Sequence, residues 1–334
     1  MSSVSVIIPC YNYGRFLGQC VGSVLGQAGV EVEVLVIDDA SPDGSGEIAA
    51  ELGRADPRVS VVRHARNMGH IATYNEGLRW ARREYLLLLS ADDFLTPGSL
   101  ARATALMDGH RSVGFVYGRA VSDGSELPAP GAQEGGWSAR VVGGPAWIAE
   151  RCRQMDNVVP TPTAVVRTSI QHGVGGYRDD SPYAGDLEMW LRLAAHADVG
   201  EVHADQAVYR RHGANMSLEW HSGLQVTFED SRRAYETVLT EHADAIPDAQ
   251  RLIGVVHRQV ARRALRMAIN RHCRGQRDAG AADWLEAHAR EVYPHARALP
   301  EWWAVQACKA VGPRAAGHVG PALDVLRARS GWGA

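Results

Sequence analysis

The chain has 334 residues, of which 46% are hydrophobic and 22% charged, and this is the composition of a globular protein with a sizeable core. A formal net charge of -3 implies no broad basic surface, which argues against a protein dedicated to nucleic-acid binding. The five cysteines form no CxxC pair, so the sequence argues against a zinc site or a disulfide framework and favours a reducing cytoplasm.

The first 118 residues alternate between apolar runs and segments with helical spacing. The apolar, β-branched runs predict five strands, at Val4–Pro9, Val32–Ile37, Val59–Arg63, Tyr85–Leu89 and Val113–Tyr117. The segments between them predict helices at Phe16–Gln27, Ser45–Leu52, Ile71–Arg83 and Gly98–Met107. This alternation indicates an α/β fold of βαβ units, with a mostly parallel, Rossmann-like sheet flanked by helices.

The rest of the chain predicts a second set of elements. Residues 123–144 are rich in Gly, Pro, Ala and Ser, which is typical of an irregular connection. Periodic structure resumes with a helix at Pro145–Cys152, a strand at Thr163–Val166 and a helix at Asp186–His196. From about Ser222 the pattern is helical. We therefore expect an α/β domain at residues 1–220 and a helical C-terminal appendage at residues 221–334.

Polar residues follow four of the predicted strands, at the edge of an open α/β sheet where ligands bind. These segments are 9–12 (PCYN), 38–43 (DDASPD), 64–67 (HARN) and 90–93 (SADD). The acidic pairs Asp38-Asp39 and Asp92-Asp93 could each cap a following turn or helix. Two such pairs at one edge would repel each other unless a cation or hydrogen-bond donors lie among them. Together they favour a hard divalent cation, Mn²⁺ or Mg²⁺, bound with a diphosphate ligand.

Four segments in this order resemble the family 2 inverting glycosyltransferases of GT-A fold: VSVIIPCYNYGRFL, VLVIDDASPDGS, NMGHIATYNEG and LLLLSADDFL. The resemblance covers roughly residues 3–217. It implies a hexosyl- or aminohexosyltransferase that uses a nucleotide-sugar donor, with a UDP-linked donor favoured, and a divalent metal. It also implies that residues up to about 118 bind the donor and residues from about 145 to 220 bind the acceptor.

The resemblance assigns a role to particular residues. The donor would be bound by Pro9, Tyr11, Asp39, Asn67, Asp92 and Arg210. Asp39 would hydrogen-bond the pyrimidine edge, and Asp92 would reach the ribose or the sugar. The cation would be ligated by Asp93, with His212 near the metal or the diphosphate. Arg211 is an alternative to Arg210 for neutralising the diphosphate.

The segment DDSPYAGDLEMWLRL is similar to the family's Glu-Asp segment, which supplies the general base. The first acid of that pair is Gly185 here, so the base would be Asp186, with Glu188 as the alternative. Asp186 could instead cap the helix that follows it. His64, His70 and the pair Asp179-Asp180 receive no role, and we expect them to be exposed loop residues.

The chain shows no signal-peptide pattern and no run of roughly 20 apolar residues that could cross a bilayer. We therefore expect a soluble enzyme that adds one sugar to a glycan, lipid-linked, natural-product or peptide acceptor. The C-terminal helices would be an appendage, or a surface for an acceptor or a homodimer. Two other functions stay open, a sugar-nucleotide pyrophosphorylase and a non-catalytic nucleotide-binding module.

Overall fold

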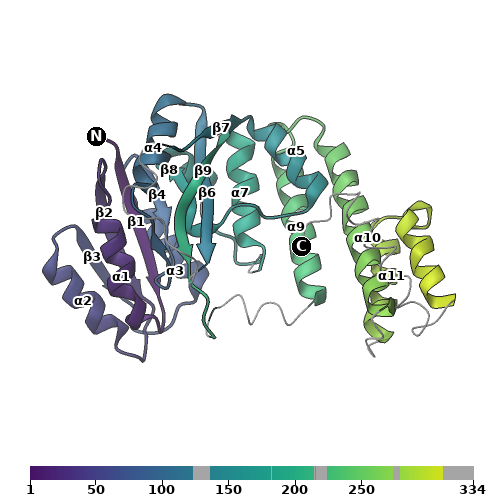
Figure 1. The fold of residues 1–334 in the computed structure, drawn as a ribbon, viewed down its shortest axis with the longest axis horizontal. Coiled ribbons are helices and arrows are strands. Elements are labelled where there is room, and N and C mark those ends of the chain that lie inside the picture. Colours follow the sequence, from purple (N-terminus) through teal and green to yellow (C-terminus); the bar gives the residue numbers. More distant parts are fainter. Residues whose placement is uncertain (123–135, 182, 214, 216–223, 274–278, 311–334) are drawn as a thin grey trace. The chain divides into compact units, whose positions relative to one another are not determined.

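The computed structural model describes residues 1–122, 136–181, 183–213, 215, 224–273 and 279–310. Within these residues the chain forms a nine-stranded sheet in the order β3-β2-β1-β4-β8-β6-β9-β5, with β7 paired to β9 (Figure 1). The strands are β1 (Ser3–Cys10), β2 (Glu31–Asp38), β3 (Val59–Arg63), β4 (Tyr85–Leu88), β5 (Phe94–Leu95), β6 (Val113–Ser122), β7 (Ala139–Val142), β8 (Val165–Arg167) and β9 (Asp198–Tyr209).

The first four strands form a parallel sheet, as the alternating pattern predicts. β1 pairs in parallel with β2 and β4, and β2 pairs in parallel with β3. The side chains of Ile8, Val34 and Leu87 are fully buried. Strands covered by helices on both faces need apolar side chains, which explains the apolar runs in β4 and in the second halves of β1 and β2.

The second half of the sheet is mixed. β6 and β9 pair in parallel, whereas β8 lies antiparallel between β4 and β6. The strand predicted at Thr163–Val166 is in part a short 3₁₀ helix, η1 (Thr161–Thr163), and β8 begins only at Val165. Pro160 and Pro162 have no backbone N–H to donate to a ladder, so the chain turns before it can pair.

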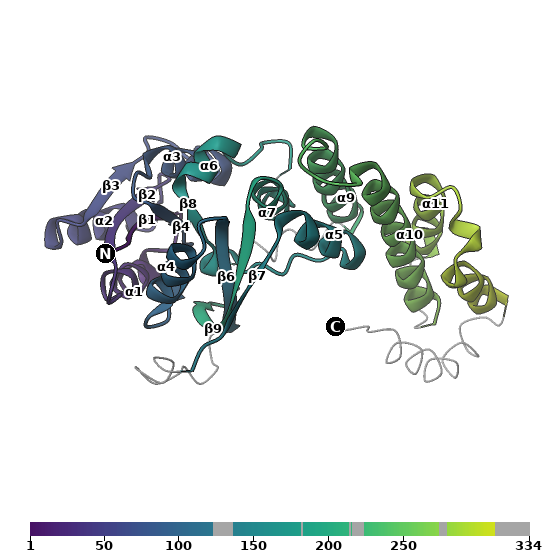
Figure 2. The ribbon, with the colours of Figure 1, turned by 90° about the horizontal axis from the view of Figure 1, so that it is seen from above.

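Helices cover both faces of the sheet (Figure 2). α1 and α4 lie on one face, and α3 and α6 lie on the other. The helices around the sheet are α1 (Gly14–Leu25), α2 (Ser45–Ala55), α3 (His70–Trp80), α4 (Ser99–Gly109), α5 (Gly144–Gln154), α6 (Thr168–Val174), α7 (Gly185–His196) and α9 (Leu224–Glu241).

The described chain divides into two compact units. The first contains residues 1–151 and 156–249, and it holds the whole sheet. This unit includes α9, so it extends beyond the boundary at residue 220 that the sequence indicates. The reason is packing, because α9 lies against α7 and buries Tyr235, Val238 and Leu239. How donor and acceptor binding divide between residues up to 118 and residues 145–220 stays a prediction.

The second unit contains residues 152–155 and 250–334, of which the described part is helical. Its elements are α10 (Ala249–Cys273), α11 (Ala279–Val292), η2 (Ala296–Ala298) and helical residues 300–310. Leu265, Leu285 and Val305 form part of its core. Across the described ranges, none of the helices combines the length and hydropathy that a bilayer span requires.

Candidate functional site

A cavity of about 460 Å³ opens in the first unit, at the carboxyl ends of β1 and β4. Its walls come from strand ends, the segment before η1, the first turn of α7 and the end of β9. The lining residues are Pro9, Tyr13, Tyr74, Leu88, Ser90, Asp92, Asp93, Ala120, Asn157, Val158, Val159, Pro160, Thr161, Pro162, Asp186, Tyr209 and Asn215. The structure therefore brings Asp92, Asp93 and Asp186 to one cavity, although Asp186 is far from the other two in sequence.

Asp92 and Asp93 lie in a turn between two strands of the sheet. The turn follows β4, and it leads into β5, which pairs antiparallel with β9. The backbone N–H of Asp93 donates to the carbonyl of Ser90 at 3.0 Å. β4 and β5 are buried strands, and the turn that joins them lines the cavity. This explains why an apolar strand is followed directly by two acids.

The carboxylate of Asp93 is almost inaccessible to solvent. The backbone N–H of Arg210 donates to its Oδ1 at 2.9 Å. Burial first, and then the neighbouring charge of Asp92, raise the pKa of Asp93 to about 8, although the backbone N–H and the charge of Arg210 oppose both effects. A carboxylate in this situation needs a positive charge nearby if it is to stay ionised near neutral pH.

Asp92 is bound by the segment that follows β9. Its Oδ2 lies 3.1 Å from His212 Nε2 and accepts from the amide of Asn215 at 3.4 Å. The ring of His212 stacks on Phe16 at 5.0 Å between centroids and meets Tyr13 edge-on at 5.5 Å. His212 is thus brought to the acidic pair, as the resemblance implies.

The acidic turn has the donor set for a hard cation. The described residues contain no group of three His, Cys, Asp or Glu side chains that could hold a metal alone. Mg²⁺ and Mn²⁺ usually use one or two protein carboxylates, with phosphate oxygens and water as the other ligands. Two buried, adjacent carboxylates, of which Asp93 has a raised pKa, fit this pattern.

Asp186 lies in the first turn of α7, partly exposed, and its side chain lines the cavity. Its Oδ2 accepts from the hydroxyl of Thr161 at 2.6 Å, and the hydroxyl of Tyr177 also hydrogen-bonds to it. Burial raises the pKa of Asp186, and these two hydrogen bonds oppose the shift. α7 begins at Gly185, with Ala184 at its N-cap position, and both hydrogen bonds of Asp186 go to side chains outside this helix. Asp186 is therefore not the helix cap.

Glu188, the alternative general base, lies away from the cavity. Its side chain is 1% exposed. It forms a two-pronged ion pair with Arg192, at 2.9 Å and 2.8 Å, and a further contact with Arg178 at 3.2 Å. The described residues that line the cavity do not include Glu188. This carboxylate therefore has a structural environment, not a catalytic one.

The predicted donor residues after β2 and β3 lie along the same edge of the sheet, outside the lining of this cavity. Asp39 accepts from the backbone N–H groups of Met68 at 2.7 Å and Gly69 at 3.0 Å. Asn67 is exposed, and its Oδ1 accepts from Gly69 N–H at 2.9 Å. Tyr11 is 44% exposed. Their role in donor binding stays a prediction.

The backbone at the ends of β1 and β2 is strained. Asn12 and Ala40 adopt φ values of 62° and 59°, in a region that non-glycine residues rarely occupy. The N–H of Asn12 donates to the hydroxyl of Ser41 at 3.0 Å, which ties the two strand ends together. Strain of this kind concentrates at ligand-binding sites, so it is consistent with donor binding at this edge.

The expectation that His64 and His70 are exposed loop residues is wrong. His64 is 11% exposed in its side chain, with Nδ1 2.7 Å from Asp39 and Nε2 2.8 Å from Glu76. His70 begins α3, and burial lowers its pKa while the charge of Asp186 raises it. A sequence pattern could not show either environment, because the partners come from other elements.

The side chain of Arg210 has partners of its own. Its guanidinium packs over the rings of Phe16 at 4.4 Å and Phe94 at 5.3 Å, and it donates to Gln19 at 2.7 Å. Its backbone N–H donates to Asp93. Arg211 is exposed. A direct role of Arg210 in donor binding stays a prediction.

Sequence reasoning missed several residues at the site. They are Tyr13, Tyr74, Thr161, Tyr177 and Asn215. Tyr74 and Tyr177 pack edge-on, with ring centroids 5.5 Å apart. An aromatic residue within a helix or a loop gives no local signal of its contacts. For Thr161 the sequence does offer a signal, because it lies in a proline-rich segment and loops beside strand ends often line a site.

The fold and this site define a class of protein. The structure matches that of TarS residues 1–349 from S. aureus in complex with UDP-GlcNAc, with a TM-score of 0.65 and 18% identity over 96% of this chain and 92% of that one. It also matches a mannosyltransferase from Pyrobaculum calidifontis in complex with GDP-Man and Mn²⁺, with a TM-score of 0.53 and 17% identity over 91% of this chain and 84% of that one. At these identities the likeness shows the fold, which is the GT-A fold.

Residues 5–166 match the model of glycosyl transferase family 2. The chain is also 31% identical to the uncharacterized protein MT1568 of Mycobacterium tuberculosis over 227 residues. This match covers 63% of this chain and 67% of that protein. The chain belongs to glycosyl transferase family 2. It spans only 29% and 42% of the length of two further relatives from Bacillus subtilis and Streptococcus pneumoniae.

Proposed function

We propose that this protein is an inverting glycosyltransferase that moves a single sugar from a nucleotide-diphosphate donor, UDP-linked by preference, to an acceptor hydroxyl or amine. The observation that carries this proposal is the shared cavity of Asp92, Asp93 and Asp186. The paired acids are suited to binding a diphosphate with its cation, and the carboxylate of Asp186 is suited to accepting a proton.

On the donor side, the strand ends supply the groups that would bind the nucleoside. An ionised carboxylate accepts roughly four hydrogen bonds. Asp39 has three partners, His64, Met68 and Gly69, which leaves one acceptor position. A pyrimidine has a single imide N–H for that position. Pro9 and Tyr11 would then line the base and ribose, with Asn67 nearby.

The cation would be Mn²⁺ or Mg²⁺, held by Asp93 and by the pair of Asp92 and His212. Bound there, it would stabilise the charge of the leaving diphosphate. This proposal is supported by the burial of both carboxylates and by the raised pKa of Asp93, which burial and the charge of Asp92 cause.

On the acceptor side, Asp186 would act as general base. A base acts best when its pKa approaches the working pH, and burial shifts the pKa of Asp186 in that direction. Inversion needs one displacement at the anomeric carbon, with the acceptor attacking from the face opposite the diphosphate. The proton of the acceptor passes to Asp186 as the new bond forms, so a covalent sugar–enzyme intermediate is not needed.

The test separates binding from turnover with Asp186→Asn. This change keeps the size of the side chain and the hydrogen bonds of one oxygen, but it removes the base. We expect kcat for release of UDP from a UDP-sugar to fall by roughly 10²- to 10⁴-fold, while binding of UDP with Mn²⁺ is unchanged. Asp180→Asn is the matched control, because Asp180 is exposed.

Two outcomes would contradict the proposal. If Asp186→Asn turned over donor as the unmodified protein does, Asp186 would not be the base. If the unmodified protein bound UDP but released no UDP from any donor with any acceptor, a non-catalytic module would be the better description. The class of acceptor, and a cytoplasmic location, stay predictions.

A further inference from the structure

Tyr177 approaches Asp186 from outside the cavity. It belongs to the segment between α6 and α7, its side chain is 7% exposed, and its hydroxyl hydrogen-bonds to Asp186. The described residues that line the cavity include Asp186 and Thr161 but not Tyr177. The hydroxyl thus reaches the carboxylate without standing where a substrate would bind.

The ring of Tyr177 lies beside the start of α7. The position before Asp186 is Gly185, and a Cβ built there would lie 3.5 Å from Cδ1 of Tyr177, which is an ordinary van der Waals contact. The ring is therefore next to the residue that precedes the proposed base.

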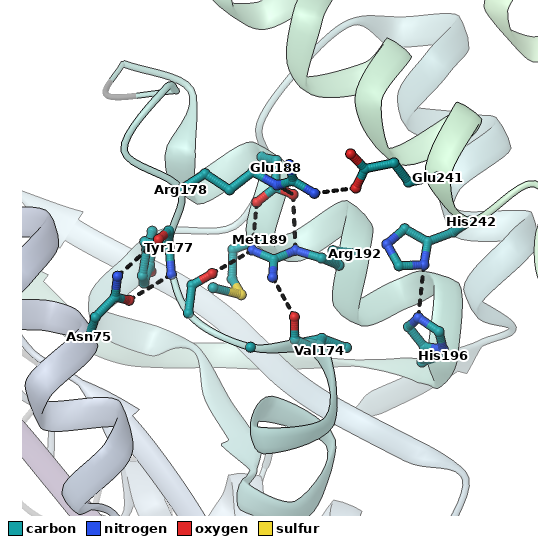
Figure 3. Close-up of polar contacts among 12 residues, drawn as sticks. Asn75, Val174, Tyr177, Arg178, Glu188, Met189, Arg192, His196, Glu241 and His242 are labelled. Atoms are coloured by element: carbon teal, nitrogen blue, oxygen red, sulfur yellow. Dashed lines mark hydrogen bonds and ion pairs between the residues drawn. The ribbon is translucent and has the colours of Figure 1, made fainter.

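The backbone of Tyr177 is clamped by Asn75 of α3. The N–H of Tyr177 donates to Asn75 Oδ1 at 2.7 Å, and the amide of Asn75 donates back to the carbonyl of Tyr177 at 2.9 Å (Figure 3). Both backbone groups of the residue are satisfied by one side chain. The ring of Tyr74, also on α3, packs edge-on against the ring of Tyr177.

The residues on both sides of Tyr177 are bound to α7, the helix that carries Asp186. Arg192 donates to the carbonyls of Val174 at 2.5 Å and Gly176 at 2.8 Å. Arg192 is itself fixed by Glu188, and both side chains are nearly inaccessible to solvent. After Tyr177, Arg178 forms ion pairs with Glu188 and with Glu241 of α9 (Figure 3).

We propose that Tyr177 is the positioning residue of Asp186, and that Asn75, Glu188 and Arg192 act through it by fixing the backbone on either side. The inference rests on the proposed role of Asp186 as general base. A carboxylate with donors from Thr161 and Tyr177 keeps one orientation, so its remaining lone pairs face the cavity. Glu188, two positions from Asp186, then supports the base and does not replace it.

The direct test is the titration of Asp186 in the full chain. Aspartate labelled with ¹³C at the carboxyl carbon gives a resonance for Asp186 that is assigned by its loss in Asp186→Asn. A hydrogen bond to the ionised form favours ionisation. In Tyr177→Phe the titration midpoint of Asp186 should therefore move to higher pH. An unchanged midpoint would overturn the proposal.

The matched control is Tyr117→Phe. Tyr117 is also buried, and its hydroxyl donates to the carboxylate of Glu201 at 2.7 Å, but it does not line the cavity. This variant loses the same kind of bond and should leave the midpoint of Asp186 in place. A shift as large as that of Tyr177→Phe would mean that the midpoint reports general loosening of the fold, which would also overturn the proposal.

A second variant tests the clamp. Glu188→Gln should move the midpoint of Asp186 in the same direction as Tyr177→Phe, and the double variant should move it no further than Tyr177→Phe alone. Independent, additive shifts would show that Glu188 does not act through Tyr177. If Tyr177→Phe folds poorly, Glu188→Gln alone decides the clamp, because an unchanged midpoint of Asp186 in that variant would contradict it.

Turnover gives the functional readout, with UDP-N-acetylglucosamine as donor, Mn²⁺, and water as acceptor. Tyr177→Phe should lower kcat by roughly tenfold, the size expected for one hydrogen bond to a charged group, with KM for the donor unchanged. A fall in KM and kcat together would contradict a positioning role. Full turnover in Asp186→Asn would refute the proposed function, whereas the titration would still decide the position of Tyr177.

Discussion

His64 lies between two carboxylates, and this contact shows how one side chain can order a binding edge. Each ring nitrogen is within hydrogen-bond distance of an acid, Asp39 on one side and Glu76 on the other. Burial lowers the pKa of His64, but the hydrogen bonds and charges of the two acids outweigh burial and leave its pKa raised. The charged imidazole donates from both nitrogens, which holds the carboxylate of Asp39 in place.

This contact predicts a pH dependence of stability. A group whose pKa is raised by folding stabilises the protein fully below its unfolded pKa, roughly 6.5 for histidine, and loses that contribution as pH rises through the folded value. We therefore expect the free energy of unfolding to fall between pH 6 and pH 8.5, and to fall less in His64→Gln. Urea denaturation at both pH values measures this.

His110→Gln is the control for that experiment, because His110 is exposed. It should keep the pH dependence of the unmodified protein. If His64→Gln kept the same dependence as well, the ion pairs of His64 would contribute nothing to stability, and its role in ordering Asp39 would be doubtful.

At the scale of elements, α7 carries the proposed base, and its start is fixed by another helix. Asp230 of α9 accepts from the backbone N–H groups of Tyr183 and Ala184, both at 2.8 Å. These residues immediately precede α7, where unpaired N–H groups need acceptors. A carboxylate from α9 thus does what a capping side chain does in other helices.

Asp230→Ala should destabilise the protein by about 1–2 kcal/mol, the usual cost of losing a helix cap. For a unit of this size that corresponds to a fall in Tm of about 2–8 °C, which differential scanning calorimetry measures. Because Asp186 follows two residues after Ala184, kcat should fall too. Asp244→Ala, at an exposed residue beyond α9, should change neither value. Equal Tm values for the two variants would contradict the capping role.

The sequence predicts some elements well and others poorly, for physical reasons. β4 and the second halves of β1 and β2 are apolar runs because helices cover both faces of the sheet, and such runs are visible in any sequence. β5 and β8 have two and three residues, and their antiparallel partners β9 and β6 are distant in the chain. No local pattern shows that pairing, so the mixed half of the sheet could not be predicted.

The same distinction applies to the site. Asp92, Asp93 and Asp186 could be predicted, because each follows a motif that resembles a known family. Tyr177 could not, because its importance comes from contacts with Asn75 and Asp186, on two other elements. The position of Glu188 in the motif makes it the alternative to Asp186 as base, whereas the helix turns its side chain toward Arg192.

At the scale of the whole molecule, the described part of the cavity belongs to the first unit. The second unit has its own core and its own ion pairs, such as that of Glu301 with Arg262 at 2.8 Å. Four cysteines, Cys10, Cys20, Cys152 and Cys308, are free and buried. Homodimer formation through the C-terminal helices stays a prediction.

The central claim is that the acids of one sheet edge bind a cation together with the diphosphate of the donor. The most direct measurement is calorimetric titration of UDP into the full chain, with Mn²⁺ and with EDTA, for the unmodified protein and for Asp93→Asn. We predict binding that depends on Mn²⁺ and that Asp93→Asn weakens by at least about tenfold, or about 1.4 kcal/mol. Equal binding of UDP in EDTA and in Asp93→Asn would contradict the account.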